Sequence, residues 1–466
     1  MKKILLLFFA CTVALGSWSC KCKTKEHKGS RMIATTTPPR PAGQTDVLQL
    51  RADPIPVVRV GVIGLGMRGW SAVSNMSYMD GVEIVALCDI LPENTARTND
   101  LLERRGRPRA LEFHSDPEAW RELSALPNLD LIYIVTDWES HARMGLQGMR
   151  DGKHVAIEVP AAMTMDEIWA LIDMSEQTRL HCMMLENCIY DHFELTVLNM
   201  AQQGLFGTIV HGEGGYIHQL EKFWDSYWND WRLKYNRTHR GDLYPTHGIG
   251  PVALAMNIHR GDKMNFLVSV DADAVSIPNF LREKRGEEVT EFRNGEHTTT
   301  LIRTEMGRSI MIQHNVASPR PYSRLFQLTG SKGFANKYPI QQFYFAENTA
   351  SDGILDHENL DSHRAISSEA RQALLAYYKH PIVKDIEELA LRVGGHGGMD
   401  FIMDYRLIYC LQRGLPLDMD VYDMAEWCCL IPLSEISLDN GSAPVEIPDF
   451  TRGAWNRLRG VHFYME

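Results

Sequence analysis

Three glycines at a fixed spacing follow a β-branched run that starts at residue 57. Residues 57–63 lead directly into Gly64-Leu-Gly66-Met-Arg-Gly69, and a helical pattern continues to about residue 78. In a strand, turn and helix of this kind, the first glycine permits the tight turn. The second lets a pyrophosphate approach the helix N-terminus, and the third lets the helix pack on the strand. The spacing predicts a dinucleotide-binding turn; a glycine-rich turn without a ligand is the alternative.

A second strand pattern supplies an acidic residue for the same site. Residues 83–88 form a mostly apolar run that ends at Asp89, 20 residues after Gly69. A carboxylate at this position accepts hydrogen bonds from the ribose hydroxyls and repels a 2′-phosphate. We therefore expect NAD rather than NADP as the cofactor.

Further strand patterns alternate with helical ones and must position the rest of this site. They span residues 129–135, 154–158 and 181–185, with helical patterns such as residues 165–177 between them. The alternation predicts a doubly wound, mostly parallel sheet, in which ligands bind outside the carboxyl ends of the strands. The segments that follow the strands should therefore face the cofactor: residues 136–141, 158–160 and 186–187.

The second half of the chain has a different pattern. Strands are expected at residues 208–218, 266–272, 297–304, 309–315 and 325–329, and helices at residues 193–203, 367–379 and 400–412. The turn at residues 305–308 and the loop at residues 317–324 predict antiparallel pairing of the strands on either side of each. The fold class is α/β: an N-terminal Rossmann domain with a doubly wound parallel sheet (57–187), a C-terminal α+β domain with an open, mostly antiparallel sheet (188–440), and a tail (441–466).

The first residues have the pattern of an export signal. Lys2 and Lys3 precede a short apolar run, and Cys20 lies where a lipoprotein cysteine would be acylated. We expect a signal over residues 1–20, a flexible tether over residues 21–56 and export to the cell envelope, with ordinary cleavage near Cys20 as the alternative. The membrane would then be reached only through a lipid anchor, since the apolar run is too short to span a bilayer.

Charge and cysteine content exclude other classes of protein. The chain of 466 residues has 48 basic and 59 acidic side chains, a net charge of −11, which argues against nucleic-acid binding. Six cysteines follow residue 56, and none forms a metal-type Cys-x-x-Cys pair. We expect them to be buried free thiols, with a disulfide as the alternative in an exported protein, and we expect no metal.

The order of these features resembles the Gfo/Idh/MocA oxidoreductase-like family over about residues 57–440. Most members have a lysine where this chain has Val159 in Glu158-Val159-Pro160, and that lysine helps to deprotonate a sugar hydroxyl. The valine variant and five further motifs instead look like glycoside hydrolase family 109. These motifs are Leu-Glu-Asn-Cys-Ile-Tyr at 185–190, Gly-Gly-Tyr-Ile-His at 214–218, Tyr-Pro-Thr-His-Gly at 244–248, Ser-Pro-Arg-Pro-Tyr-Ser-Arg at 318–324 and Gly-Gly-His-Gly-Gly-Met-Asp at 394–400.

This resemblance implies an α-N-acetylgalactosaminidase that holds NAD tightly and hydrolyses a glycan by oxidation, elimination, addition and reduction, with no net redox change. It places these residues at the cofactor: Met67, Arg68, Asp89, Trp138, Glu139, Ser140, His141, Glu158, Val159 and Asn187. It places these at the sugar: Tyr216, Arg232, Tyr244, Pro245, Thr246, His247 and Tyr322. Asp137 departs from the proline that is usual in the family, which affects the expected rim of the nicotinamide site.

Two residues are the candidates for catalysis. His247 suits deprotonation of the C3 hydroxyl because imidazole titrates near neutral pH. Tyr216 is the candidate base at C2, and its phenol needs a lowered pKa from a nearby positive charge such as oxidised nicotinamide. By residue pattern alone, Tyr216 could be a core aromatic and His247 a loop or capping histidine.

Two other functions are compatible with the same residues. A sugar dehydrogenase would share the nucleotide domain and would reduce added NAD in bulk. A non-catalytic, NAD-loaded sugar-binding protein would bind a glycoside without cleaving it. In each case the partner is a small glycan, and self-association is possible because open-sheet members of this fold often form oligomers.

Overall fold

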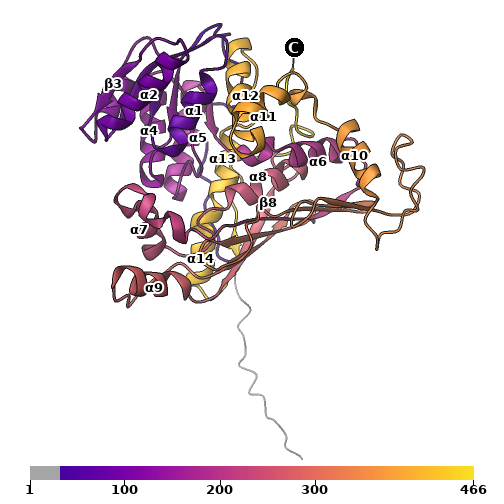
Figure 1. Cartoon of the computed structure of the whole chain (residues 1–466). Helices are drawn as coiled ribbons and strands as arrows, with labels where there is room; N and C mark the ends of the chain where they lie inside the picture. The colour runs from indigo at the N-terminus through magenta and orange to yellow at the C-terminus, as the bar shows by residue number, and fades with distance from the viewer. Residues whose placement is uncertain (1–31, 466) are drawn as a thin grey trace, which may run out of the picture. The chain divides into compact units, whose positions relative to one another are not determined.

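The computed structural model describes residues 32–465 (Figure 1). The expected signal with its lipidation site, residues 1–20, and the first part of the expected tether, residues 21–31, lie outside the described residues. Within the described part of the chain, every helix is too short or too polar to cross a bilayer.

The first sheet has six strands in the order β3-β2-β1-β4-β5-β6, and all of its pairs are parallel. The expected Rossmann sheet is therefore confirmed. Its strands are β1 (Val58–Ile63), β2 (Val82–Asp89), β3 (Leu111–His114), β4 (Leu131–Ile134), β5 (His154–Ile157) and β6 (Cys182–Met184). Its helices are α1 (Met67–Met76), α2 (Pro92–Arg104), α3 (Trp120–Ser124), α4 (Trp138–Arg150) and α5 (Met165–Thr178).

Burial explains which of these strands the sequence predicts. Every residue of β4 and β5 is buried, as expected for parallel strands covered by helices on both faces. The sequence did not predict the edge strand β3, because it is only four residues long and three of those residues are exposed.

The second sheet has eight strands in the order β13-β12-β11-β7-β10-β9-β8-β14. It is mostly antiparallel, as expected; the pairing of β7 with β10 is parallel. The strands are β7 (Ile209–Ile217), β8 (Met264–Asp271), β9 (Thr298–Thr304), β10 (Ser309–Asn315), β11 (Phe326–Gly330), β12 (Gly333–Asn336), β13 (Gln342–Phe345) and β14 (Val445–Glu446).

One expected strand pair is wrong. The loop 317–324 predicted that β10 and β11 pair with each other, but β11 pairs with β7, which lies between them. The loop is long enough to step across one intervening strand, a distance of about 10 Å. The turn 305–308 does join an antiparallel pair, β9 and β10, as expected.

The helices of the second half pack on this sheet and return to the first domain. Helix α8 (Thr246–Ala255) lies across β7 at two glycines: a Cβ on Gly214 would lie 2.1 Å from the carbonyl oxygen of Gly248. Helix α12 (Met399–Arg413) packs against α1, and α13 (Val421–Cys428) packs against α5. The helices are α6 (His192–Gln202), α7 (Trp231–Thr238), α8 (Thr246–Ala255), α9 (Ser276–Phe280), α10 (Ser368–Tyr377), α11 (Glu387–Val393), α12 (Met399–Arg413), α13 (Val421–Cys428) and α14 (Leu430–Asp439). The short helical turns are η1 (Asn187–Tyr190), η2 (Glu221–Ser226), η3 (Trp228–Asp230), η4 (Leu281–Arg285), η5 (Pro381–Val383) and η6 (His396–Gly398).

Two segments expected to be irregular are packed. In residues 32–56, expected as part of a flexible tether, Val47 is buried and Arg40 forms an ion pair with the fully buried Glu176 at 2.9 Å. In the tail, β14 pairs with β8 and Phe450 is buried. These contacts join residues far apart in the chain, so local composition does not reveal them.

The six cysteines of the described region are free and buried, as expected. They are Cys88, Cys182, Cys188, Cys410, Cys428 and Cys429.

Candidate functional site

The glycine turn leaves the start of α1 open to a ligand. Gly64 has φ +89°, and a Cβ on it would lie 2.2 Å from the carbonyl oxygen of Val135. A Cβ on Gly69 would lie 1.9 Å from the carbonyl oxygen of Gly64, so neither glycine can be replaced without movement. Gly66 begins the helix with no capping side chain, and a Cβ there would meet nothing within 4 Å. Uncapped amides beside open space fit the pyrophosphate of a dinucleotide.

Asp89 is fixed at the carboxyl end of β2, next to this turn. One of its carboxylate oxygens accepts a hydrogen bond from the Leu65 amide at 2.6 Å. The other accepts from the Leu91 amide at 2.9 Å and from Asn94 Nδ2 at 3.1 Å. The carboxylate therefore orders the glycine turn, and its contact with a ribose stays a prediction.

Arg68 joins the first turn of α1 to the C-terminal half of the chain. Its guanidinium donates to Glu158 at 2.8 and 3.0 Å and to Asp400 at 2.7 Å. Asp400 also accepts from Asn187 at 2.6 Å, and His396 Nδ1 lies 2.8 Å from its carboxylate. Burial raises the pKa of Asp400, but the attraction of Arg68 and hydrogen bonds from His396 and Asn187 hold it below its usual value. Three residues expected at the cofactor, Arg68, Glu158 and Asn187, thus form one network.

The segment after β4 is held in place by hydrogen bonds within the protein, and its contact with the cofactor stays a prediction. Asp137 caps α4, accepting from the amide and the hydroxyl of Ser140 at 3.1 and 2.8 Å. The ring nitrogens of His141 lie 2.8 Å from the carbonyl oxygen of Pro160 and 3.1 Å from that of Thr136. His141 is buried and links the loops after β4 and β5.

The other residues expected at the cofactor differ in exposure. Met67 is 73% exposed, and Glu139 is also exposed. Val159 is buried, and Trp138 is buried beneath aromatic rings of the second domain.

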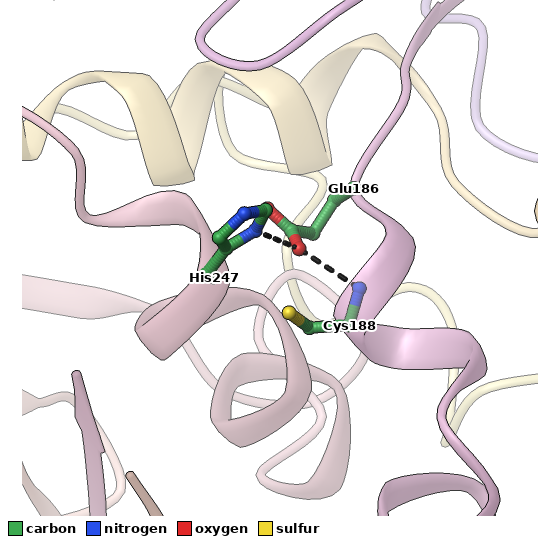
Figure 2. A group of neighbouring side chains, drawn as sticks. All are labelled: Glu186, Cys188 and His247. Carbon is green, nitrogen blue, oxygen red and sulfur yellow. Dashed lines mark hydrogen bonds and ion pairs between the residues drawn. The ribbon is translucent and has the colours of Figure 1, made fainter. Parts of the chain in front are cut away.

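His247 and Glu186 form a buried pair (Figure 2). His247 Nδ1 lies 2.6 Å from Glu186 Oε1, which also accepts from the Cys188 amide at 3.0 Å. Burial raises the pKa of Glu186, but the attraction of His247 and these hydrogen bonds hold it below its usual value. Burial also lowers the pKa of His247, although Glu186 opposes that shift. A carboxylate beside a neutral imidazole fixes the proton on Nδ1 and leaves Nε2 as a base.

Ligand atoms of Glu186, Cys188 and His247 lie within 4.8 Å of one another, close enough to bind a metal ion. Two observations disfavour a cation here. Arg324 Nη1 lies 3.3 Å from Cys188 Sγ, and burial holds the pKa of that thiol well above its usual value. A neutral thiol beside a guanidinium is a poor metal ligand.

Tyr216, Tyr244 and His247 form a cluster of rings where β7 ends and α8 begins. The ring centroids are 4.8 Å apart for Tyr216 and Tyr244, 5.5 Å for Tyr216 and His247, and 4.9 Å for Tyr244 and His247. Trp138 of the nucleotide domain stacks on Tyr244 at 5.7 Å. The catalytic candidates are thus brought together beside the loop that follows β4.

Arg232 completes this cluster. Its guanidinium lies 4.9 Å from the ring centroids of both Trp138 and Tyr244, and it donates to the Tyr227 hydroxyl at 2.9 Å. It is buried, and its Nε and Nη2 have no partner among the described residues. These free donors can bind a polar ligand group.

The remaining residues expected at the sugar flank the cluster. Pro245 and Thr246 are buried at the start of α8. Tyr322 is 42% exposed and packs edge-on against His218 at 4.8 Å.

Sequence reasoning did not assign three residues of this site: His218, Arg324 and Asp400. It placed Glu186 on the rim facing the cofactor but did not pair it with His247. All four lie inside motifs that the sequence presents, at 185–190, 214–218, 318–324 and 394–400. The motifs mark the segments, but the hydrogen bonds that give each residue a role arise only in the fold.

Comparisons with known proteins identify the families to which the two halves of the chain are similar. Residues 58–185 match the family model of the oxidoreductase family with an NAD-binding Rossmann fold. Residues 190–457 match the model of the glycosyl hydrolase 109 C-terminal domain. The first domain is therefore an NAD-binding Rossmann domain, as the glycine turn predicted.

Relatives match over the full chain. A glycosyl hydrolase family 109 protein from Bacteroides thetaiotaomicron is 54% identical and covers 100% of both chains. One from Porphyromonas gingivalis is 55% identical and covers 97% of both chains.

Among solved structures, a levoglucosan dehydrogenase in complex with NADH and levoglucosan has a TM-score of 0.62 at 18% identity, covering 84% of this chain and 100% of the other. The WlbA dehydrogenase of Bordetella pertussis, in complex with NADH and UDP-GlcNAcA, has a TM-score of 0.61 at 15% identity, covering 84% of this chain and 98% of the other. These two share the fold. The family model and the full-length relatives decide the family: this chain belongs to glycosyl hydrolase family 109.

Proposed function

We propose that this protein hydrolyses terminal α-N-acetylgalactosaminides with NAD retained and no net redox change. The observation that carries the proposal is the buried His247–Glu186 pair, whose imidazole lies 5.5 Å from the Tyr216 ring. An NAD-binding domain adjoins these two candidate bases, and glycoside hydrolysis that depends on NAD is a recognised alternative to paired carboxylates.

His247 takes the proton of the sugar C3 hydroxyl in this proposal. Glu186 keeps the Nδ1 proton in place, so the lone pair of Nε2 is the base. When bound, NAD would accept a hydride from C3 and return it at the end of the cycle. Arg68, Asp89, Asn187 and the open amides of α1 would hold the dinucleotide.

Tyr216 then removes the C2 proton, which a neighbouring C3 ketone makes acidic. Loss of that proton expels the C1 substituent by elimination, and water adds at C1 to complete the hydrolysis. Arg232, with two unpaired N–H donors in the cluster, binds polar groups of the sugar. The rings of Trp138 and Tyr244 offer apolar faces on which a sugar can pack.

A sugar dehydrogenase remains the second candidate. Most dehydrogenases of the Gfo/Idh/MocA type have a lysine at the position of Val159 in this chain. The buried side chain of Val159 cannot accept a proton from a sugar hydroxyl. A dehydrogenase would reduce added NAD in proportion to the sugar consumed, whereas a hydrolase of the proposed kind would not.

The deciding experiment uses the NAD-loaded protein and aryl glycosides of N-acetylgalactosamine, galactose and N-acetylglucosamine in both anomers. In deuterated water, the released sugar should carry deuterium at C2, because elimination breaks the C2–H bond. Tyr216→Phe should lower the rate about 10²- to 10⁴-fold, the usual effect of losing a general base. Tyr344→Phe, which removes a hydroxyl bonded to Gln342 in β13, is the matched control. Product without C2 deuterium, together with equal cleavage by the apo protein, would exclude this mechanism.

Export and lipidation at Cys20 form a separate proposal. They are motivated by Lys2, Lys3 and the apolar run that follows. Mass spectrometry of the native protein should find a multiply acylated Cys20 at the mature N-terminus. An unmodified N-terminus elsewhere would exclude lipidation.

A further inference from the structure

We propose that Arg324 is a positioning residue whose guanidinium stabilises the negatively charged form of the Tyr216 side chain while that side chain acts as the base. The proposal rests on the proposed function, because it explains how a buried phenol can take a proton from carbon. It assigns to the protein itself the positive charge that Tyr216 requires.

Arg324 lies opposite Tyr216 in the segment that leads into β11, next to the isolated antiparallel bridge between Ile217 and Ser323. Ile217 and Ser323 exchange two backbone hydrogen bonds of 2.9 Å, and the Gly215 amide donates to the carbonyl of Leu325 at 3.0 Å. This register makes Tyr216 and Arg324 a non-hydrogen-bonded pair, the position at which cross-strand side chains are closest and share one face of the sheet.

Arg324 has no carboxylate partner within salt-bridge distance among the residues that the structure describes. It is 7% exposed, its Nε has no hydrogen-bond partner, and its Nη1 contacts only sulfur, at 3.3 Å from Cys188 and 3.7 Å from Met399. Two other buried arginines are paired with carboxylates: Arg406 and Arg260 each donate two hydrogen bonds, of 2.7 and 2.8 Å, to Asp418 and Asp423. The charge of Glu186 acts on Arg324 only from beyond salt-bridge distance. A buried cation without a directly paired carboxylate is costly, and an anion that forms beside it lowers that cost.

The other groups around the Tyr216 phenol are compatible with a transient phenolate. His218 Nδ1 lies 2.8 Å from the phenol oxygen, and the Arg232 guanidinium is 6.0 Å from the ring centroid. Burial lowers the pKa of His218 to about 4, assisted by Arg232 and Arg324, so the ring is neutral and one tautomer can donate to a phenolate. Burial raises the pKa of Tyr216, and both arginines oppose that shift. The titratable and charged groups around the phenol are His218, Arg232, Arg324, Tyr227, Tyr244, His247 and Tyr322.

The first test measures Tyr216 itself and needs no turnover. The ultraviolet absorbance of tyrosinate is titrated in the NAD-loaded protein, and the curve of Tyr216→Phe is subtracted to isolate Tyr216. Arg324→Met should move the midpoint to higher pH by about 1 to 3 units, the usual effect of removing one adjacent opposite charge. Arg324→Lys should restore most of the shift. Arg324→Gln, also neutral, replaces Arg324→Met if the latter fails to fold.

The second test is the pH dependence of deuterium entry at C2 of the product. Tyr216 acts in its deprotonated form, so the rate rises with pH through the pKa of the phenol. That rise should occur at higher pH in Arg324→Met and near its original position in Arg324→Lys. Arg320→Met removes an exposed positive charge from the same loop and should leave the profile unchanged.

The two tests separate the proposal from the function on which it rests. A Tyr216 midpoint that is the same in wild type and in the neutral variants would overturn the role of Arg324, even in an active hydrolase. A shifted midpoint in a protein that cleaves no glycoside would retain the electrostatic pairing but exclude its use as a base in this reaction.

Discussion

Glu186 Oε1 and His247 Nδ1 lie 2.6 Å apart in a pair whose side chains are 0% and 6% exposed. The two residues come from different halves of the chain: Glu186 follows β6 of the nucleotide sheet, and His247 lies in the first turn of α8. The interface between the halves therefore contains the group that we expect to act first.

Replacing Glu186 with Gln tests this pair. The amide keeps the volume of the carboxylate but not its charge, so the imidazole becomes a weaker base. We expect kcat to fall about 10²- to 10⁴-fold, with less effect on KM, because binding contacts remain. Any transient nicotinamide absorbance should fall in parallel.

Glu426→Gln is a matched control, because Glu426 forms a second buried pair, with His259. The two side chains are 2.8 Å apart, and neither belongs to the aromatic cluster. It should lower Tm while the folded enzyme keeps its kcat. Equal loss of kcat in both variants would contradict a specific role for Glu186.

Asp400→Asn should weaken retention of NAD. Asp400 carries a negative charge that holds both Arg68 and Asn187, and the neutral amide cannot hold both. We expect NAD to dissociate about tenfold more readily, measured as the fraction of protein that retains the dinucleotide after gel filtration.

Asp404→Asn, one helical turn later in α12, serves as the control for Asp400. Burial raises the pKa of Asp404 to about 7, so about half of the carboxyl groups are protonated at neutral pH, and Asn resembles that neutral form. The Asp404 variant should retain NAD as the wild type does. Equal loss from both variants would mean that α12 acts only through its packing.

Asp89→Ala should change the choice of dinucleotide. The variant loses the expected contact with the ribose and the acceptor for the Leu65 amide, so NAD should bind about tenfold more weakly. Binding of NADP should weaken less, because a repulsive charge is removed along with the acceptor. Titration of the apo protein with both dinucleotides measures this, with the exposed Asp100→Ala as the control. An unchanged ratio of the two affinities would contradict the assignment.

Asp242→Asn should make the protein more stable at alkaline pH. Asp242 is fully buried, and burial raises its pKa to about 7, more than the nearby Tyr244 amide lowers it. A raised folded pKa gives stability that is complete below the unfolded value near 4 and is lost as pH rises through about 7. The Asn side chain does not ionise, so Tm of the variant relative to wild type should be about 1–4 °C higher at pH 8 than at pH 5.

Asp418→Asn is the opposite case and provides the comparison. Asp418 forms an ion pair with the buried Arg406 at 2.7 Å, so its loss leaves a cation unpaired. Tm should fall at both pH values. A similar fall in Asp242→Asn would show that its carboxylate is needed for stability.

The sequence by itself determined the features that depend on local pattern. Gly64, Gly66 and Gly69 between a strand and a helix predicted the nucleotide-binding turn, and the buried runs of β4 and β5 predicted the parallel sheet. The family motifs named Tyr216 and His247 as candidates. Each of these sequence patterns lies within one short segment of the chain, so it can be recognised without knowing what the segment contacts in the fold.

The tertiary structure decided what those candidates touch. Glu186 is 61 residues from His247 in sequence, and Arg68 is 332 residues from Asp400. The position of Arg324 opposite Tyr216 depends on β7 pairing with β11, whereas the loop lengths had predicted a different partner for β11. The same holds for residues 32–56, whose buried contacts lie far along the chain. Such contacts are set by strand register and by packing between the two halves, and no local pattern of residues encodes either.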